Sequence, residues 1–161
     1  MSKEIKIIII GGILTISIIV GISVLFSNSS SKSSSIPDDQ IVAQKGLHWH
    51  PRLAVYINGK KQEFTDNIGL GAVHQKMHTH AQDYKDGVVH MEMQGVVTKD
   101  ETKLGNFFRI WGKTFNSTQI FDKKNGDGGI VKMLVNGKEN KEFENYEMRD
   151  GDKIEVKFEV I

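Results

Sequence analysis

Cysteine is absent from this chain of 161 residues. Without cysteine, the protein forms no disulfides, holds no metal through thiolates and has no thiol nucleophile. A blue-copper electron-transfer site is also excluded, because such a site depends on a copper–thiolate bond. The chain likewise has no HExxH sequence and no nucleophile motif of a hydrolase. Any metal site in this protein therefore uses ligands other than thiolates.

Neither positive nor negative charge predominates in the chain. The chain has 21 Lys and Arg residues against 20 Asp and Glu residues, which gives a formal net charge of +1 at pH 7. The two signs are interspersed, and no basic block marks a surface for nucleic acid. We therefore predict that nucleic acid is not among the partners of this protein.

The longest uncharged apolar run covers residues 7–26, with the sequence IIIIGGILTISIIVGISVLF. At about 1.5 Å rise per residue, a helix of this length reaches roughly 30 Å, the thickness of the hydrocarbon core of a bilayer. The run has no polar stripe of the kind that a buried core helix shows. It is also longer than a usual signal-peptide core, and the following LFSNSSS offers only a weak cleavage site. We therefore predict an uncleaved transmembrane helix in the lipid bilayer.

The flanks of this run predict its orientation and the organisation of the rest. Two lysines lie within residues 1–6, whereas only Lys32 follows the run closely, so the positive-inside rule predicts a cytoplasmic N-terminus. Residues 27–37 are rich in serine and are expected to form a flexible linker. Residues 38–161 then form an extracytoplasmic domain on a single-pass anchor in the cell membrane.

Strand and turn patterns dominate the predicted domain. Residues 52–64 (RLAVYINGKKQEF) and 130–143 (IVKMLVNGKENKEF) each place an Asn-Gly pair between two strand-like segments. Asn-Gly is the strongest short-range signal for a β-hairpin. Residues 154–160 alternate apolar and charged side chains, as a half-buried strand does. We therefore predict two Asn-Gly hairpins and a final strand.

One helix is predicted between the two hairpins. In residues 102–115, TKLGNFFRIWGKTF, large apolar side chains recur at helical spacing, and Gly112 is a plausible stop. The expected fold class is therefore α+β, a mostly β domain with one packed helix. The second hairpin followed by a strand favours a layout like that of the β-grasp.

All six histidines lie between residues 48 and 90. They belong to two segments, HWHPRLAVYING at residues 48–59 and HQKMHTHAQDYKDGVVHMEM at residues 74–93. The pair His-x-His occurs once in each segment. Two residues along a strand lie on the same face with Cα atoms about 6.6 Å apart, so their imidazoles can reach one ion at roughly 2 Å.

Strand alternation predicts where these imidazoles point. If residues 47–57 form one strand, His48 and His50 lie opposite an apolar face that includes Trp49. In residues 87–94, GVVHMEMQ, the histidine and the glutamate likewise lie opposite a valine and two methionines. The methionines and tryptophans are therefore interpreted as core rather than as metal ligands.

The presence of two His-x-His pairs and His90 on polar strand faces predicts a bound copper or zinc ion, because both metals bind three or four imidazole nitrogens. The predicted ligands of this single ion are His48, His50, His78, His80 and His90. His74 is expected to lie outside the ligand shell, because it follows the loop-like segment IGLGAV. The expected role is the holding, delivery or sensing of metal, or that of an accessory subunit in a larger copper-containing membrane enzyme.

Three alternatives stay open at this point. A zinc-dependent hydrolase would use three histidines and an open position to activate water, with Glu92 as general base. A structural metal would staple the fold, so that chelation would melt the domain. A hydrogen-bonded histidine network would need no metal.

The motifs HWHPRLAVYING, HTH with GVVHMEM, and LGNFFRIWGKTF followed by VNG and DGDKIEV are shared with one group of proteins. The chain resembles a family of membrane-anchored, histidine-rich extracytoplasmic proteins of bacteria and archaea, above all ammonia-oxidising archaea. The resemblance implies that the five predicted ligands match the family's histidine positions, and it implies no activity. Other members read His-Thr-His-Asp, whereas this chain has Ala81 in place of the acid, so that Asp83 or Asp86 would have to replace it.

Overall fold

The structure, a computed structural model, describes residues 36–160. The predicted N-terminus (1–6), membrane span (7–26) and most of the serine-rich linker (27–37) lie outside these residues. Among the described residues, no helix is long and apolar enough to cross a membrane. Residues 36–160 form a mostly β domain with one α-helix, which confirms the predicted α+β class.

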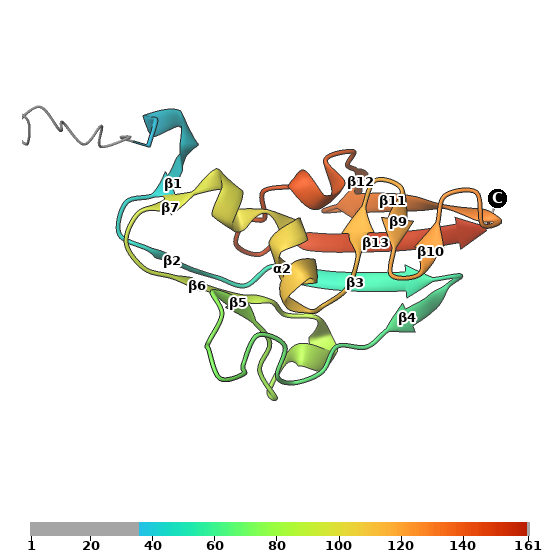
Figure 1. The fold of residues 1–161 in the computed structure, drawn as a ribbon, viewed down its shortest axis with the longest axis horizontal. Helices are drawn as coiled ribbons and strands as arrows, with labels where there is room; N and C mark the ends of the chain where they lie inside the picture. Colours follow the sequence, from blue (N-terminus) through green and yellow to red (C-terminus); the bar gives the residue numbers. More distant parts are fainter. Residues whose placement is uncertain (1–35, 161) are drawn as a thin grey trace, which may run out of the picture. The chain divides into compact units, whose positions relative to one another are not determined.

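Five strands form the main sheet of the domain, shown in Figure 1. In order across the sheet they are β12 (Lys138–Glu139), β11 (Gly129–Val135), β13 (Lys153–Val160), β3 (Arg52–Ile57) and β4 (Lys60–Gln62). β13 pairs in parallel with β3, whereas its pairing with β11 is antiparallel. The last strand along the chain is therefore the central strand of the sheet.

Both predicted Asn-Gly hairpins are confirmed. The first joins β3 to β4 through Asn58 and Gly59, with φ angles of 50° and 77°. The second joins β11 to β12 through Asn136 and Gly137, with φ angles of 52° and 79°. Two successive residues with positive φ are typical of a type I′ turn, whose twist matches that of the paired strands. Asn and Gly adopt this conformation most readily.

The predicted helix is also confirmed, as α2 (Leu104–Ile110). It is preceded by the 3-10 helix η3 (Lys99–Thr102), where Thr98 and Glu101 form a reciprocal capping box. The helix ends before Gly112, whose φ of 70° stops the helical turn. Leu104, Phe107 and Phe108 are buried, so one face of the helix belongs to the core.

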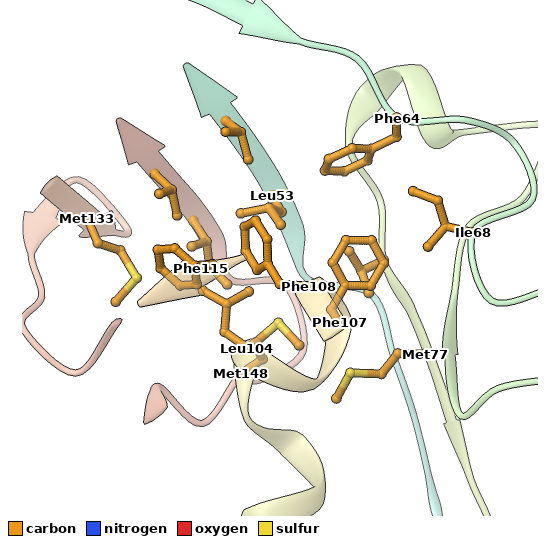
Figure 2. Close-up of a cluster of buried hydrophobic side chains, with 14 of the residues drawn as sticks. Leu53, Phe64, Ile68, Met77, Leu104, Phe107, Phe108, Phe115, Met133 and Met148 are labelled. Carbon is orange, nitrogen blue, oxygen red and sulfur yellow. The ribbon is translucent and has the colours of Figure 1, made fainter. Parts of the chain in front are cut away.

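The buried side chains of α2 pack against the main sheet and the strands beside it. Figure 2 shows Phe107 and Phe108 close to Leu53 of β3, with Phe64 and Ile68 at one end of the cluster and Met133 at the other. Phe108 stacks on Phe115 with ring centroids 4.4 Å apart. The cluster also includes Met77 and Met91, so it extends beneath the strands that carry the imidazoles.

A second, three-stranded sheet carries most of the candidate site. It consists of β2 (Leu47–Trp49), β6 (His90–Met93) and β5 (Met77–His78), in that order, with antiparallel pairing throughout. In Figure 1 this sheet lies at one end of the domain, beside the start of β3. Since all three strands are short, the site depends on the loops between them as well as on the pairing.

The prediction of one continuous strand over residues 47–57 is wrong. The chain leaves β2 after Trp49 and enters the main sheet as β3 at Arg52, with buried Pro51 between them. Proline has no N–H to offer a ladder, and it restricts the backbone of the residue before it. The break at Pro51 therefore lets consecutive strands belong to different sheets.

The remaining elements are short. They comprise two further small sheets, β1 (Ile41–Ala43) with β7 (Val97–Thr98), and β8 (Phe115–Asn116) with β9 (Gln119–Ile120) and β10 (Lys123–Lys124), together with the 3-10 helices η1 (Asp38–Gln40), η2 (Tyr84–Asp86) and η4 (Phe143–Asn145).

Candidate metal centre

Strand register divides the small sheet into an apolar face and an imidazole face. His48 lies opposite Glu92, and His78 lies opposite His90. Residues directly opposite in an antiparallel pair share one face, so these four side chains share a surface. The alternate residues form the other face and are Leu47, Trp49, Met77, Met91 and Met93.

The predicted alternation of His48 and His90 against apolar neighbours is therefore confirmed. The three methionines of this sheet are buried, with at most 4% of their surface exposed. They belong to the main hydrophobic cluster together with the side chains of α2. As predicted, they are core residues, and the imidazole face of the sheet lies on the opposite side.

His78 is the buried centre of the histidine cluster, with none of its surface exposed. Its Nε2 lies 3.1 Å from Nε2 of His80 and 3.3 Å from Nε2 of His74. The carboxylate oxygen Oε1 of Glu92 lies 3.9 Å from the same nitrogen. Several potential metal ligands thus surround a buried imidazole, with His80 at its Nε2 and His74 about equally close to both ring nitrogens.

The other ring nitrogen of His78 has a different partner. Its Nδ1 lies 3.1 Å from the main-chain oxygen of Gln75, which can only accept a hydrogen bond. Nδ1 therefore carries the proton, and Nε2 is left with a free lone pair. Fixing of the tautomer by a main-chain carbonyl is the usual arrangement for a histidine that binds metal.

Burial lowers the pKa of His78 from its ordinary value of 6.5, since it disfavours the charged ring, and the neighbouring His74 and His80 lower it further. The hydrogen bond to the Gln75 carbonyl and the nearby Glu92 act in the opposite direction but do not prevail. His78 is therefore neutral at pH 7 and ready to act as a ligand.

This pKa shift predicts how the stability of the metal-free domain depends on pH. Below pH 6.5 the unfolded chain protonates His78 while the folded domain does not, so the unfolded state binds more protons. We expect the free energy of unfolding contributed by this residue to fall as the pH drops from 6.5 toward the lower pKa of the folded state. Urea unfolding of the unmodified chain and of His78→Gln, between pH 5 and 7.5 with a chelator present, tests this. An equal dependence of the free energy of unfolding on pH in the two proteins would contradict it.

His74 lies inside the cluster, contrary to the expectation that it would stand apart. Its Nε2 is 3.2 Å from Nδ1 and 3.3 Å from Nε2 of His78. The loop before it folds back on itself, because Gln75 donates its N–H to the carbonyl of Gly69 and His74 forms a bridge with Leu70. The contact between His74 and His78 forms without a helix, and the loop-like sequence before His74 gave no signal for it.

His90 occupies the middle of the cluster and has a carboxylate partner. Its Nε2 donates to Oδ2 of Asp83 at 2.9 Å, while the other carboxylate oxygen of Asp83 is buried and has no hydrogen-bond partner among the described residues. Of the two acids Asp83 and Asp86, Asp83 therefore contacts a histidine of the cluster, whereas Asp86 is exposed. A carboxylate on one ring nitrogen orients the other nitrogen for a metal.

His48 and His50 form the solvent-facing edge, with 61% and 43% of their side-chain surfaces exposed. Their ring centroids lie 4.6 Å apart, and the ring of His50 lies 4.8 Å from that of His90. The main-chain N–H of His50 donates to Oδ1 of Asp150 at 2.8 Å, which ties this edge to the loop before β13. Nε2 of His48 lies 3.2 Å from Oε1 of Glu92.

Within residues 36–160, side chains that could hold a metal fall into three overlapping groups with ligand atoms within 4.8 Å of one another. The groups are His48, His50 and His90, then His74, His78 and Glu92, and finally His80, His90 and Glu92. Each of the five predicted ligands belongs to at least one group, but no group contains all five, and His74 and Glu92 are added to them.

The spacing around His78 fits a metal ion. In a tetrahedral zinc site with Zn–N distances of 2.0–2.1 Å, neighbouring nitrogens lie about 3.3–3.4 Å apart. The nitrogen separations of 3.1 Å to His80 and 3.3 Å to His74 are close to this edge length. Small side-chain rotations would therefore complete a site. A surface pocket of about 490 Å³ adjoins His48, His74 and Glu92.

No protein-family model, curated protein or solved structure matches this chain.

Proposed function

We propose that this domain binds a transition metal, copper or zinc, on the imidazole face of its small sheet. The observation that carries the proposal is the clustering of imidazoles at buried His78: Nε2 of His80 lies 3.1 Å from its Nε2, and Nε2 of His74 lies 3.2 Å and 3.3 Å from its two ring nitrogens. A neutral buried imidazole with its tautomer fixed is a prepared ligand. Both metals accept all-nitrogen shells, and copper(II) binds more tightly in the divalent series.

The test is a competitive titration of the full-length chain, purified without a histidine tag, with zinc(II) and copper(II). Metal content after gel filtration, measured by elemental analysis, should reach at least one ion per chain. Binding should weaken as the pH falls through 6–7, because protonated imidazole cannot ligate. A content well below one for both metals, before and after reconstitution, would remove the proposal.

A holding or delivery role is supported by the gradient of exposure across the cluster. His78 is buried, whereas His48 and His50 are exposed enough to exchange a metal with a partner. A purely structural role is less well supported, because a continuous apolar core, from Leu53 to Phe158, supports the fold without a metal. We therefore expect a chelator to empty the site while the circular dichroism spectrum keeps its folded form.

The hydrolase alternative, with Glu92 as general base, has less support than metal binding alone. Glu92 approaches both His48 and His78 and belongs to two of the three groups that could hold an ion. A carboxylate in that position is a ligand rather than a free base. A larger copper-containing membrane enzyme as partner stays a prediction from the sequence.

We also propose that the domain has the β-grasp layout. Its first hairpin, β3–β4, lies on one side of the central strand β13, and its second hairpin, β11–β12, lies on the other. The first strand of the earlier hairpin is parallel to the last strand, and the connection between the hairpins contains the helix α2. This order and direction support the proposal.

Display outside the cell membrane, on an anchor formed by residues 7–26, is proposed on the sequence alone. Protease added to intact cells or right-side-out vesicles should release the domain by cutting within residues 27–37, where a serine-rich tether is expected. The control is the same treatment after lysis. Protection of the domain in intact vesicles, with cleavage only after lysis, would reverse the proposed orientation.

A further inference from the structure

The cluster contains more ligands than one ion can use. Six imidazoles are linked from ring to ring, from His74 through His78, His80 and His90 to His50 and His48. Zinc in proteins takes four ligands in almost all structural sites and three plus water in catalytic sites. A single ion would therefore leave at least two of the six imidazoles without a role in binding.

The ligands separate into two ends. His74 and His78, with Glu92, form one group, called here the inner group. His48, His50 and His90 form another, called here the outer group, which shares no residue with the inner one. The outer rings of His48 and His50 are exposed, so they can rotate to bring their nitrogens closer together.

A third group, His80, His90 and Glu92, joins these two, because it shares Glu92 with the inner group and His90 with the outer group. Oε1 of Glu92 is 3.2 Å from Nε2 of His48 in the outer group and 3.9 Å from Nε2 of His78 in the inner group. The ring of His80 lies 4.7 Å from that of His78 and 4.4 Å from that of His90. Oε1 of Glu92 can therefore reach a ligand position at either site, and His80, whose Nε2 lies 3.1 Å from Nε2 of His78, can complete the inner shell.

We infer that the domain binds two metal ions per chain rather than one, and this inference rests on the proposed metal-binding function. His74, His78, His80 and Glu92 form the inner site, whose four ligands fill a tetrahedral shell. His48, His50 and His90 form the outer site, whose three imidazoles leave one position for water or for an exogenous ligand. Glu92 and His90 lie at the boundary between the sites, and Asp83 orients the ring of His90.

The inference is tested by counting ions in matched single variants of the full-length chain. Zinc(II) or copper(II) alone is the probe, and bound metal is measured by elemental analysis after gel filtration. The unmodified chain should hold two ions. His74→Ala and His50→Ala should each hold one, and the double variant should hold neither tightly. Gln94→Ala, an exposed neighbour in the adjoining pocket, is the control and should hold two.

A spectroscopic comparison identifies which ion each variant keeps. With one equivalent of copper(II), His74→Ala and His50→Ala should give different electron paramagnetic resonance spectra, because each retains a different set of ligands. One ion in the unmodified chain, or loss of all metal in each single variant, would overturn the two-site inference while leaving the proposed function standing. No bound metal in the unmodified chain would instead refute the proposed function itself.

Discussion

Replacement of His78 by alanine is expected to lower the affinity of the inner site for zinc at least about 100-fold, since changes to residues that merely orient ligands already cost 10–100-fold. His78 is the buried ring on which the nitrogens of His74 and His80 converge, and its tautomer is fixed by the Gln75 carbonyl. Its removal takes away a ligand that the exposed residues around it cannot replace. Isothermal titration with zinc, in competition with a chelator, measures the change.

The matched control is His48→Ala, which removes an exposed ring of the outer group and should leave the inner affinity within a few-fold. Circular dichroism of both variants with a chelator present must show the folded spectrum, because His78→Ala also leaves a small cavity. Unchanged zinc affinity in a folded His78→Ala variant would show that this ring is not a ligand, and the inner site would have to be abandoned.

Phe108→Ala is expected to lower the free energy of unfolding by about 3–5 kcal/mol, a usual cost for deleting a buried aromatic ring. Phe108 is 1% exposed, and its ring lies 4.4 Å from Phe115, 5.9 Å from Trp111 and 6.5 Å from Phe121. The ring therefore joins α2 to the strands that follow it.

Urea unfolding with a chelator present isolates this effect from that of bound metal. Val73→Ala is the comparison, since Val73 is 68% exposed and its truncation should change the free energy of unfolding by no more than about 0.5 kcal/mol. A loss below about 1 kcal/mol for Phe108→Ala would mean that the helix contributes little to the core, contrary to the packing in Figure 2.

The sequence predicted the elements of this domain well where a single residue pair determines a turn or where an alternation of apolar and polar residues determines a strand. The turns at Asn58-Gly59 and Asn136-Gly137 need only positive φ at two positions, which those residue types supply. The alternation around Met91 and Met93 likewise follows from the two faces of any strand. These signals are short-range, so a single sequence is enough to read them.

The contacts that sequence alone did not reveal depend on how loops fold back. His74 reaches His78 because the loop turns at Gly69 and Gln75, and no periodic pattern encodes that return. Asp83 and Asp86 were both candidates for an acid beside the histidines, and the hydrogen bond of Asp83 to His90 and the exposure of Asp86 favour Asp83. The strand pattern of residues 47–57 likewise does not show that the chain passes from one sheet to another at Pro51, because this depends on the partners of β2 and β3.

The central position of β13 has a consequence for the order in which the protein is made. A ribosome produces residues 48–92, with all the imidazoles, before it produces residues 153–160, and Arg52 cannot find its partner Lys153 until then. Pairing between such distant segments is slow to form. We therefore expect newly made chains to display their histidines before the main sheet exists.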